Sequence, residues 1–289
     1  MHNSMQITKN IKKYSVALLG VVLLFNSCKK EYESIESIDE AKIQDYLSKN
    51  NISAIKDPSG FYYQILDQGA GEPLLNKDSV FYQTSVKSLT GTVYFSPSPY
   101  FAEGTYLGYV NPTAYRTAMH SINRGGKVRL IVPSHMAFGK NGSGNIPPNE
   151  VIVSEISVLP EKKLWQVEDN MIQNFITTQA LTGFDRKPSR VYVKVTTLGT
   201  GALVTPYSTI TAKYKGRVLN GTQFDASDSF KTPINELVHG WEKGLVGLPK
   251  GSVVRIIFPS DLGYGATPRP SIPANSILDF DIELLEVEE

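Results

Sequence analysis

The stretch GSVVRIIFPSDLGYGATPRPSIPANSILDFDIELL, residues 251–285, contains two strand-like segments separated by a loop. The first segment is apolar and ends at Pro259, and the second alternates apolar and acidic residues, which is typical of antiparallel strands with one buried face. In the loop, Tyr264 stands between Gly263 and Gly265, and glycine allows a tight turn. Taken alone, this loop is an ordinary surface turn with an aromatic side chain, so its meaning depends on the rest of the chain.

The sequence before this stretch predicts more strands and one short helix. Residues 209–218 (TITAKYKGRV) alternate, and Asn220-Gly221 directly after them is a strong tight-turn signal. In residues 240–251, Trp241, Leu245 and Leu248 are spaced to form one apolar helical stripe. We therefore expect an α+β fold in which an antiparallel sheet packs against one helix.

The chain repeats this layout at a spacing of about 130 residues, which indicates a duplication. KIQDYL (42–47) is similar to MIQNFI (171–176), and both segments have helical spacing. Each is followed by a proline, a tyrosine-bearing strand and a glycine-rich turn, GAG (69–71) in the first copy and GTG (199–201) in the second. Neither turn continues to a third glycine that opens a helix, so a dinucleotide site is excluded.

The N-terminus has the pattern of an export signal. Three lysines precede the apolar run 16–25, which is too short to span a membrane. Asn26 and Ser27 follow, and then the single cysteine, Cys28; a small residue directly before such a cysteine resembles the lipidation site of bacterial lipoproteins. We expect a signal peptide over 1–27, a polar tether over 28–38 and a lipid anchor on Cys28 in the cell envelope, on the outer membrane. The alternative is a signal peptide cut elsewhere, with Cys28 incidental.

The composition excludes several classes of function. The net charge of the 289-residue chain is +1 without a basic tract, which argues against nucleic-acid binding. The four histidines are scattered without metal-ligand spacing, and neither a phosphate-binding loop nor a nucleophile elbow is present. We therefore expect no metal and no cofactor.

Residues 189–285 resemble the FKBP-type peptidyl-prolyl cis-trans isomerases. The resemblance is carried by YKG, NGTQFDAS, ELVHGWEKGL, LPKGSVVRIIFPSDLGYGA and SILDFDIELL, in the family's order. It implies an antiparallel half-barrel wrapped on a short helix, with a ligand pocket between them. It also implies isomerase activity on X-Pro bonds, proline-containing polypeptides as partners and a macrolide as a further ligand.

The resemblance also assigns site residues. The implied catalytic residues are Tyr264, Asp225 and Trp241, with the Tyr264 hydroxyl and the Ile272 N–H as donors to the substrate and Asp225 orienting Tyr214 or the ligand. The substrate-binding residues implied by the family motifs are Tyr214, Phe224, Leu237, Val238, Ile272 and Phe280. The chain departs from the family at Thr232, where an aromatic residue is usual.

The first copy keeps the frame of the motifs but loses most of these side chains. Phe138 occupies the position of Tyr264, and Tyr115 occupies that of Trp241. Ser154 replaces Phe280, Thr84 replaces Tyr214, and the pair Tyr94-Phe95 replaces Phe224-Asp225. Only Ile146 is identical to its counterpart, Ile272. We expect a degenerate, inactive domain over 39–160, a connector helix over 161–186 and the isomerase domain over 187–289. An insert at 96–113 is either a binding surface or a packed loop.

Three functions were weighed. The favoured one is a peptidyl-prolyl cis-trans isomerase that acts on exported proteins and binds peptides as a chaperone does. The second is a non-catalytic chaperone or adaptor of the cell envelope, and the third is a structural envelope protein. Retention of Tyr264, Asp225 and Trp241 in the second copy favours the enzyme.

Overall fold

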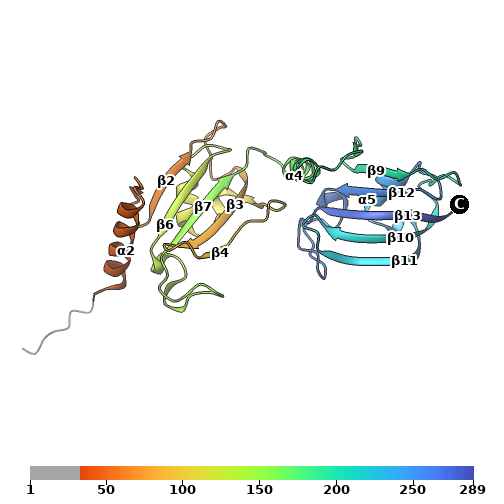
Figure 1. Cartoon of the computed structure of the whole chain (residues 1–289). Helices are drawn as coiled ribbons and strands as arrows, with labels where there is room; N and C mark the ends of the chain where they lie inside the picture. The colour runs from red at the N-terminus through yellow and green to blue at the C-terminus, as the bar shows by residue number, and fades with distance from the viewer. Residues whose placement is uncertain (1–32) are drawn as a thin grey trace, which may run out of the picture. The chain divides into compact units, whose positions relative to one another are not determined.

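The structure is a computed structural model that describes residues 33–289, so the predicted signal peptide and Cys28 lie outside the described residues. Residues 39–289 contain two antiparallel sheets, and each is preceded by a long helix and packs against a short one (Figure 1). The predicted α+β class, with two half-barrel modules, is confirmed. Within residues 33–289, no helix is both long and apolar enough to cross a membrane.

The first module is built from helix α2 and seven strands. The sheet order is β1-β2-β6-β7-β3-β4, and β5 also pairs with β3. The bounds are α2 Ile35–Lys49, β1 Ile55–Lys56, β2 Tyr62–Asp67, β3 Ser79–Ser88, β4 Val93–Phe95, β5 Glu103–Tyr106, α3 Thr113–Met119, β6 Lys127–Val132 and β7 Ile152–Val158.

The second module repeats this order in one six-stranded sheet, β11-β10-β13-β12-β9-β8. Its bounds are α4 Leu164–Thr178, β8 Asp185–Arg186, β9 Tyr192–Thr197, β10 Thr209–Val218, β11 Gln223–Pro233, α5 His239–Leu245, β12 Val253–Phe258 and β13 Leu278–Glu288. The equivalent strands take equivalent places in both sheets, as a duplication requires. The long strand β11 corresponds to β4 and β5 together, which the insert separates.

Three predicted boundaries differ from the structure. Helix α2 begins at Ile35, inside the predicted tether, and β8 pairs with β9 although it falls in the predicted connector. Helix α5 ends at Leu245, because Gly247 turns the chain with a φ of +90°. Leu248, predicted on the helical stripe, therefore lies beyond the helix and packs half-buried against the same core.

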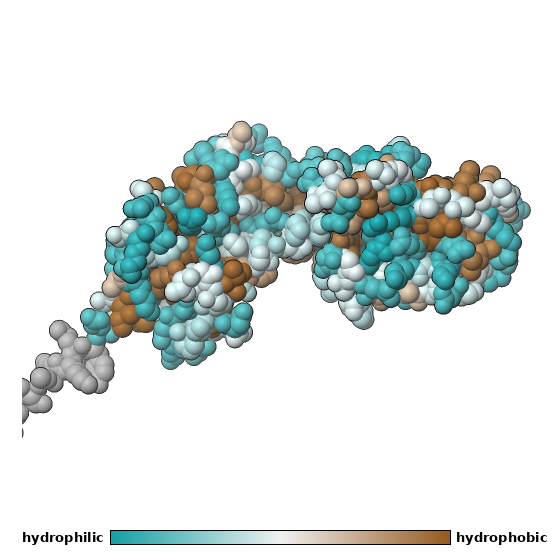
Figure 2. Space-filling view, viewed as in Figure 1, coloured by the Kyte–Doolittle hydropathy of each residue, from teal (hydrophilic) through white to brown (hydrophobic). Residues whose placement is uncertain are grey.

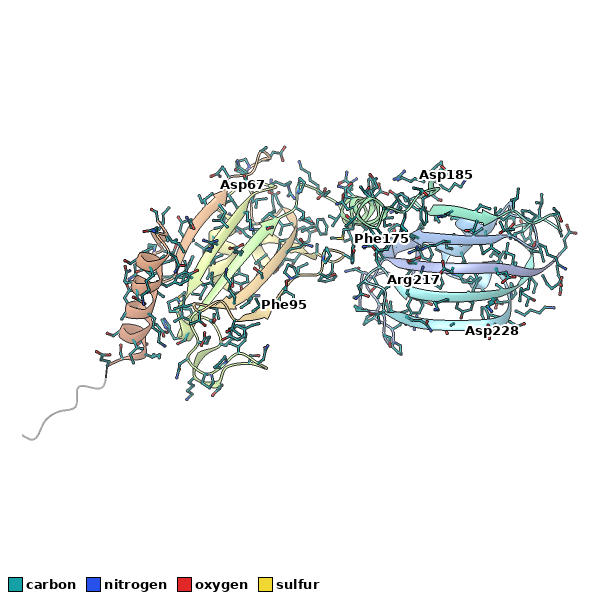
Figure 3. All side chains as sticks on the ribbon, viewed as in Figure 1. Asp67, Phe95, Phe175, Asp185, Arg217 and Asp228 are labelled. Carbon is teal, nitrogen blue, oxygen red and sulfur yellow. The ribbon has the colours of Figure 1, made fainter. Side chains whose placement is uncertain are left out.

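The outer face of the second sheet is charged, and Figure 2 shows a hydrophilic surface over β13. Asp279 was predicted on the polar face of this strand, but its side chain is only 1% exposed. It accepts hydrogen bonds from the guanidinium groups of Arg217, labelled in Figure 3, and Arg255, at 2.6–3.1 Å. Two bidentate arginines supply the pairing that a buried carboxylate requires.

Candidate functional site

The inner face of the second sheet carries a cluster of aromatic rings around Phe280 on β13. The centroid of its ring lies 5.3 Å from that of Trp241, 5.5 Å from that of Phe224 and 6.2 Å from that of Tyr214. The first two contacts are edge-to-face, which is a favoured arrangement for aromatic pairs. Three elements, β10, β11 and α5, thus direct aromatic rings at one side chain of β13.

Tyr214 and Asp225 are joined across the edge of this cluster. They lie on the neighbouring strands β10 and β11, and the Tyr214 hydroxyl donates a hydrogen bond to Asp225 Oδ2 at 2.5 Å. Burial and this hydrogen bond raise the pKa of Tyr214 well above its usual value, so the hydroxyl stays protonated and keeps donating. Of the two partners that the resemblance implied for Asp225, Tyr214 or the ligand, the structure shows the hydrogen bond with Tyr214.

The base of the cluster is formed by Trp241 on α5, which is buried, and by Phe258 on β12. The Phe258 ring stacks on Phe280 at 5.8 Å with an interplanar angle of 10°. Helix α5 comes this close because Gly240 has no side chain: a Cβ there would stand 2.4 Å from the Phe258 ring. The sequence predicts Phe258 only as a strand residue.

Phe230 is a second ring that the sequence analysis missed. It lies on β11, and its ring contacts Tyr214 edge-to-face at 5.7 Å. The family pattern places an aromatic residue at Thr232, two positions later. Asp228 interrupts the alternation of β11, and the pairing with β10 shifts register between Ala212 and Tyr214, so the sequence pattern alone did not place Phe230 at the site.

The remaining predicted pocket residues lie at the margins of the same core. Leu237 and Val238 are half-buried just before α5, and Ile272 is buried in the loop before β13. The Ile272 N–H donates to the carbonyl of Arg269 at 3.0 Å. The expectation that this N–H is available to a substrate is therefore wrong for this structure, because the loop folds back on itself and uses the donor internally.

Tyr264 lies half-buried against the same core, in the loop after β12. Among residues 33–289, no hydrogen bond involves its hydroxyl, and the Arg269 guanidinium lies 5.6 Å from its ring centroid. Gly265 has a φ of +57°, a conformation that favours glycine. Gly263 serves differently: a Cβ there would stand 2.8 Å from Leu278. The two glycines thus permit the turn and the close packing that present Tyr264.

Comparisons with known proteins agree with this architecture. The family model of the FKBP-type peptidyl-prolyl cis-trans isomerase matches residues 112–159 and 201–285. The FKBP-type peptidyl-prolyl cis-trans isomerase FkpA of Buchnera aphidicola subsp. Schizaphis graminum is 32% identical over 206 residues, which cover 65% of this chain and 80% of that protein.

FkpA of Escherichia coli is also similar to this chain, in sequence and in structure. FkpA of Escherichia coli (strain K12) is 34% identical over 99 residues, which cover 33% of this chain and 37% of that protein. The crystal structure of FkpA from Escherichia coli aligns with a TM-score of 0.39 and 26% identity, over 43% of this chain and 59% of that one.

The chain belongs to the FKBP-type peptidyl-prolyl cis-trans isomerase family. The predicted family and enzyme class are confirmed, and the function is peptidyl-prolyl cis-trans isomerisation. The two matched segments fall one in each FKBP-like module, as a duplication requires.

In the first FKBP-like module, the place of the aromatic cluster is taken by a polar pair. Tyr115 and Ser154, which correspond to Trp241 and Phe280, share a buried hydrogen bond of 2.6 Å between their hydroxyl groups. Burial raises the pKa of Tyr115. Thr84, at the position of Tyr214, is buried and its hydroxyl has no partner in residues 33–289.

Two of the remaining substituted positions of this module are exposed. Phe138, which replaces Tyr264, is 37% exposed, and Phe95, which replaces Asp225, is also exposed. Phe138 has no hydroxyl to offer a substrate carbonyl, and Phe95 cannot accept a hydrogen bond. The module therefore lacks both polar groups that border the cluster of the second module.

The insert of the first FKBP-like module is partly packed and partly exposed. The carbonyls of Ser98 and Phe101 accept hydrogen bonds from Gln83 Nε2 at 2.9 Å, and the Tyr100 ring contacts Phe175 of α4 at 5.5 Å. Further along, Tyr106 and Tyr109 are exposed. The segment 96–102 is thus a packed loop, and the two tyrosines are its exposed aromatic part.

No group of three or more His, Cys, Asp or Glu side chains in the described part of the chain could hold a metal ion. The groups around Phe280 are aromatic rings, hydroxyls and one carboxylate. Such a set can enclose an apolar ring and donate hydrogen bonds.

Proposed function

We propose that the second FKBP-like module is the isomerase domain and that the X-Pro bond of the substrate isomerises at the aromatic cluster around Phe280. The convergence of Tyr214, Phe224 and Trp241 on Phe280, with Tyr264 beside them, carries this proposal. An aromatic wall of this kind fits a proline ring, whose flat apolar faces pack well on aromatic side chains.

The chemistry needs no covalent step. Rotation about the X-Pro amide faces a barrier of roughly 18–20 kcal/mol because the planar amide loses resonance as it twists. The twisted amide is less polar than the planar form, so an apolar cleft without water stabilises it relative to the ground state. The wall around Phe280 supplies this surrounding without a nucleophile, metal or proton relay.

The polar groups orient the substrate. The Tyr264 hydroxyl, which has no partner in the described residues, donates a hydrogen bond to the substrate carbonyl. Asp225 does not contact the amide itself: it holds the Tyr214 hydroxyl and so fixes the ring that walls the cleft. Leu237, Val238 and Ile272 complete the apolar surface.

The test compares proline isomerisation of a short X-Pro peptide by the full chain and its variants. Trp241→Ala removes a wall worth about 1.5–3 kcal/mol of apolar contact, so kcat/KM falls about 10- to 100-fold. Tyr264→Phe removes one hydrogen bond, so kcat/KM falls about 2- to 10-fold.

The matched control is Tyr115→Phe in the first FKBP-like module, which leaves kcat/KM unchanged. Wild-type rates for both second-module variants would refute the assignment of the site. If the full chain itself gave no acceleration yet bound the peptide, the non-catalytic chaperone or adaptor would be the correct function.

The substrates we propose are proline-containing segments of exported proteins, and the chain acts from the cell envelope. The support is the apolar run 16–25 followed by Cys28, the only cysteine. Lipidation of Cys28 would tether both modules to a membrane. Mass spectrometry of membrane-extracted protein should find a diacylglycerol adduct at Cys28, and an unmodified or absent cysteine would contradict the anchor.

A relative that is 39% identical over 97 residues, from Gibberella zeae, bears the name FK506-binding protein 4. The second module keeps the aromatic cluster around Phe280, so we propose that a macrolide of this class competes with peptide there. Competition in the same isomerisation assay tests this.

A further inference from the structure

Glu168 on α4 makes a buried contact with the loop that carries Tyr264. The residue is 3% exposed. Its Oε2 accepts a hydrogen bond from the Ser260 N–H at 3.0 Å, and its Oε1 accepts one from the Ser260 hydroxyl at 2.6 Å. Both donors of a buried serine are therefore bound by one carboxylate from a helix 92 residues earlier in the chain.

Ser260 passes this contact on to the residues on either side of Tyr264. Its carbonyl accepts hydrogen bonds from the Gly263 N–H at 2.9 Å and from the Gly265 N–H at 2.8 Å. Both glycines that bracket the tyrosine are thus bound to the one residue that Glu168 holds. Glu168 holds the N–H and hydroxyl of Ser260, and the carbonyl of the same residue holds the backbone on both sides of Tyr264.

A second contact holds the same turn from the side of β9. Arg190, two residues before β9, binds the carboxylate of Asp261 with both terminal nitrogens, at 2.6 and 3.1 Å. Asp261 is half exposed, so solvent weakens this pair. The Glu168 contact is buried, so solvent competes with its hydrogen bonds less than with the exposed pair.

The first FKBP-like module contains the same contact without a tyrosine to position. Asp39 on α2 accepts hydrogen bonds from the Ser134 N–H at 2.8 Å and the Ser134 hydroxyl at 2.6 Å. The loop that follows carries Phe138, which lacks a hydroxyl. Docking of the preceding helix is therefore the shared role of the two carboxylates, and any effect on catalysis is confined to the second module.

We propose that Glu168 is a positioning residue of the isomerase site, which acts through Ser260 and the two flanking glycines to set the Tyr264 hydroxyl over the cleft. The inference rests on the role proposed above for Tyr264. If Glu168 has this role, helix α4 contributes to catalysis although it lies outside the isomerase domain predicted from the sequence.

The experiment is a double-mutant cycle in the full chain. Glu168→Ala leaves both Ser260 donors buried without a partner, and we expect kcat/KM to fall about 2- to 10-fold, no more than in Tyr264→Phe, because the effect runs through that hydroxyl. If Glu168 acts through Tyr264, then adding Tyr264→Phe to Glu168→Ala lowers kcat/KM by less than about twofold more. A purely structural role predicts that the two losses multiply.

Two further variants separate positioning from folding. Glu168→Gln keeps an acceptor for the Ser260 N–H and a group that can bond the Ser260 hydroxyl, so kcat/KM stays within about threefold of wild type. The matched control Asp39→Ala removes the equivalent contact of the first module and leaves kcat/KM unchanged. If Glu168→Ala does not fold, Ser260→Ala, which removes only the hydroxyl, takes its place in the cycle.

The inference is overturned if folded Glu168→Ala, or Ser260→Ala in its place, retains wild-type kcat/KM, or if its loss multiplies with that of Tyr264→Phe. It is also overturned if Glu168→Gln loses as much kcat/KM as Glu168→Ala, or if Asp39→Ala is equally impaired. Failure of the proposed function looks different: Trp241→Ala and Tyr264→Phe then both have the wild-type rate, whatever Glu168 does.

Discussion

Substituting Gly216 by valine should damage the site by crowding it. Gly216 on β10 pairs with Phe280 on β13, and a Cβ there would stand 2.6 Å from Phe280 Cε1 and 2.8 Å from Phe224 Cζ. Non-bonded carbons attract only at about 3.5–4.0 Å, so the Phe280 ring has to move by about 1 Å. Because Trp241 and Phe258 hold that ring from the other sides, we expect a destabilisation of about 1–3 kcal/mol.

The first module shows how the same crowding is relieved. There the position of Gly216 is Val86, and it pairs with Ser154, which stands where Phe280 would be. The smaller partner leaves room for the larger one. In the second module, Phe280→Ser alone should cost about 3–5 kcal/mol, as removal of a buried phenylalanine ring does. Combined with Gly216→Val, it should cost less than the sum of the two by about 1–2 kcal/mol.

The assay is urea unfolding followed by tryptophan fluorescence. The only tryptophans, Trp165 and Trp241, lie on α4 and α5, so the signal reports the second module. In the same samples, Gly216→Val should lower kcat/KM by more than about tenfold, because the wall of the cleft moves. Val86→Ala in the first module is the control and should leave kcat/KM unchanged. Additive free energies for Gly216→Val and Phe280→Ser would refute the reasoning.

Two further predictions concern α4. Burial raises the pKa of Glu168 from 4.5 to about 7; Asp261 adds a smaller increase, which Arg190 opposes. The stability that this group adds is therefore complete below about pH 4.5 and is lost as the pH rises through 7. Urea unfolding of Glu168→Gln between these pH values should lack this fall, and an unchanged slope would contradict it. A chain cut to residues 187–289 lacks Glu168, so its thermal midpoint and kcat/KM should fall below those of residues 161–289; equal values would show that α4 is dispensable.

The strands of the second module could be predicted because their signals are local. The predicted segment 209–218 coincides with β10, and the Asn220-Gly221 turn links it to β11. Alternation reports one buried face wherever a strand covers a core, and it needs no knowledge of the partner strands. The family motifs then placed Tyr214, Trp241 and Phe280 within reach of one another.

What the sequence did not reveal depends on contacts between distant segments. Asp279 has the same alternating context as Asp281, yet only Asp279 is buried between two arginines. Glu168 stands on what was expected to be a simple connector helix. Its binding to Ser260 follows from the fold, because neither residue type predicts the other at a separation of 92 positions. Phe258, a strand residue by its pattern, is part of the site only because Gly240 lets α5 approach it.

The two modules also show how one copy can lack the aromatic cluster and keep the sheet. At Val86 and Ser154 the changes offset each other in volume, and the hydroxyl that Ser154 introduces is satisfied by Tyr115. A buried polar group with a partner adds little cost, whereas an unpaired one costs about 1–3 kcal/mol. The aromatic cluster and the polar pair are therefore alternative solutions for the same inner face. Only the aromatic cluster offers the apolar rings on which we propose that a prolyl ring packs.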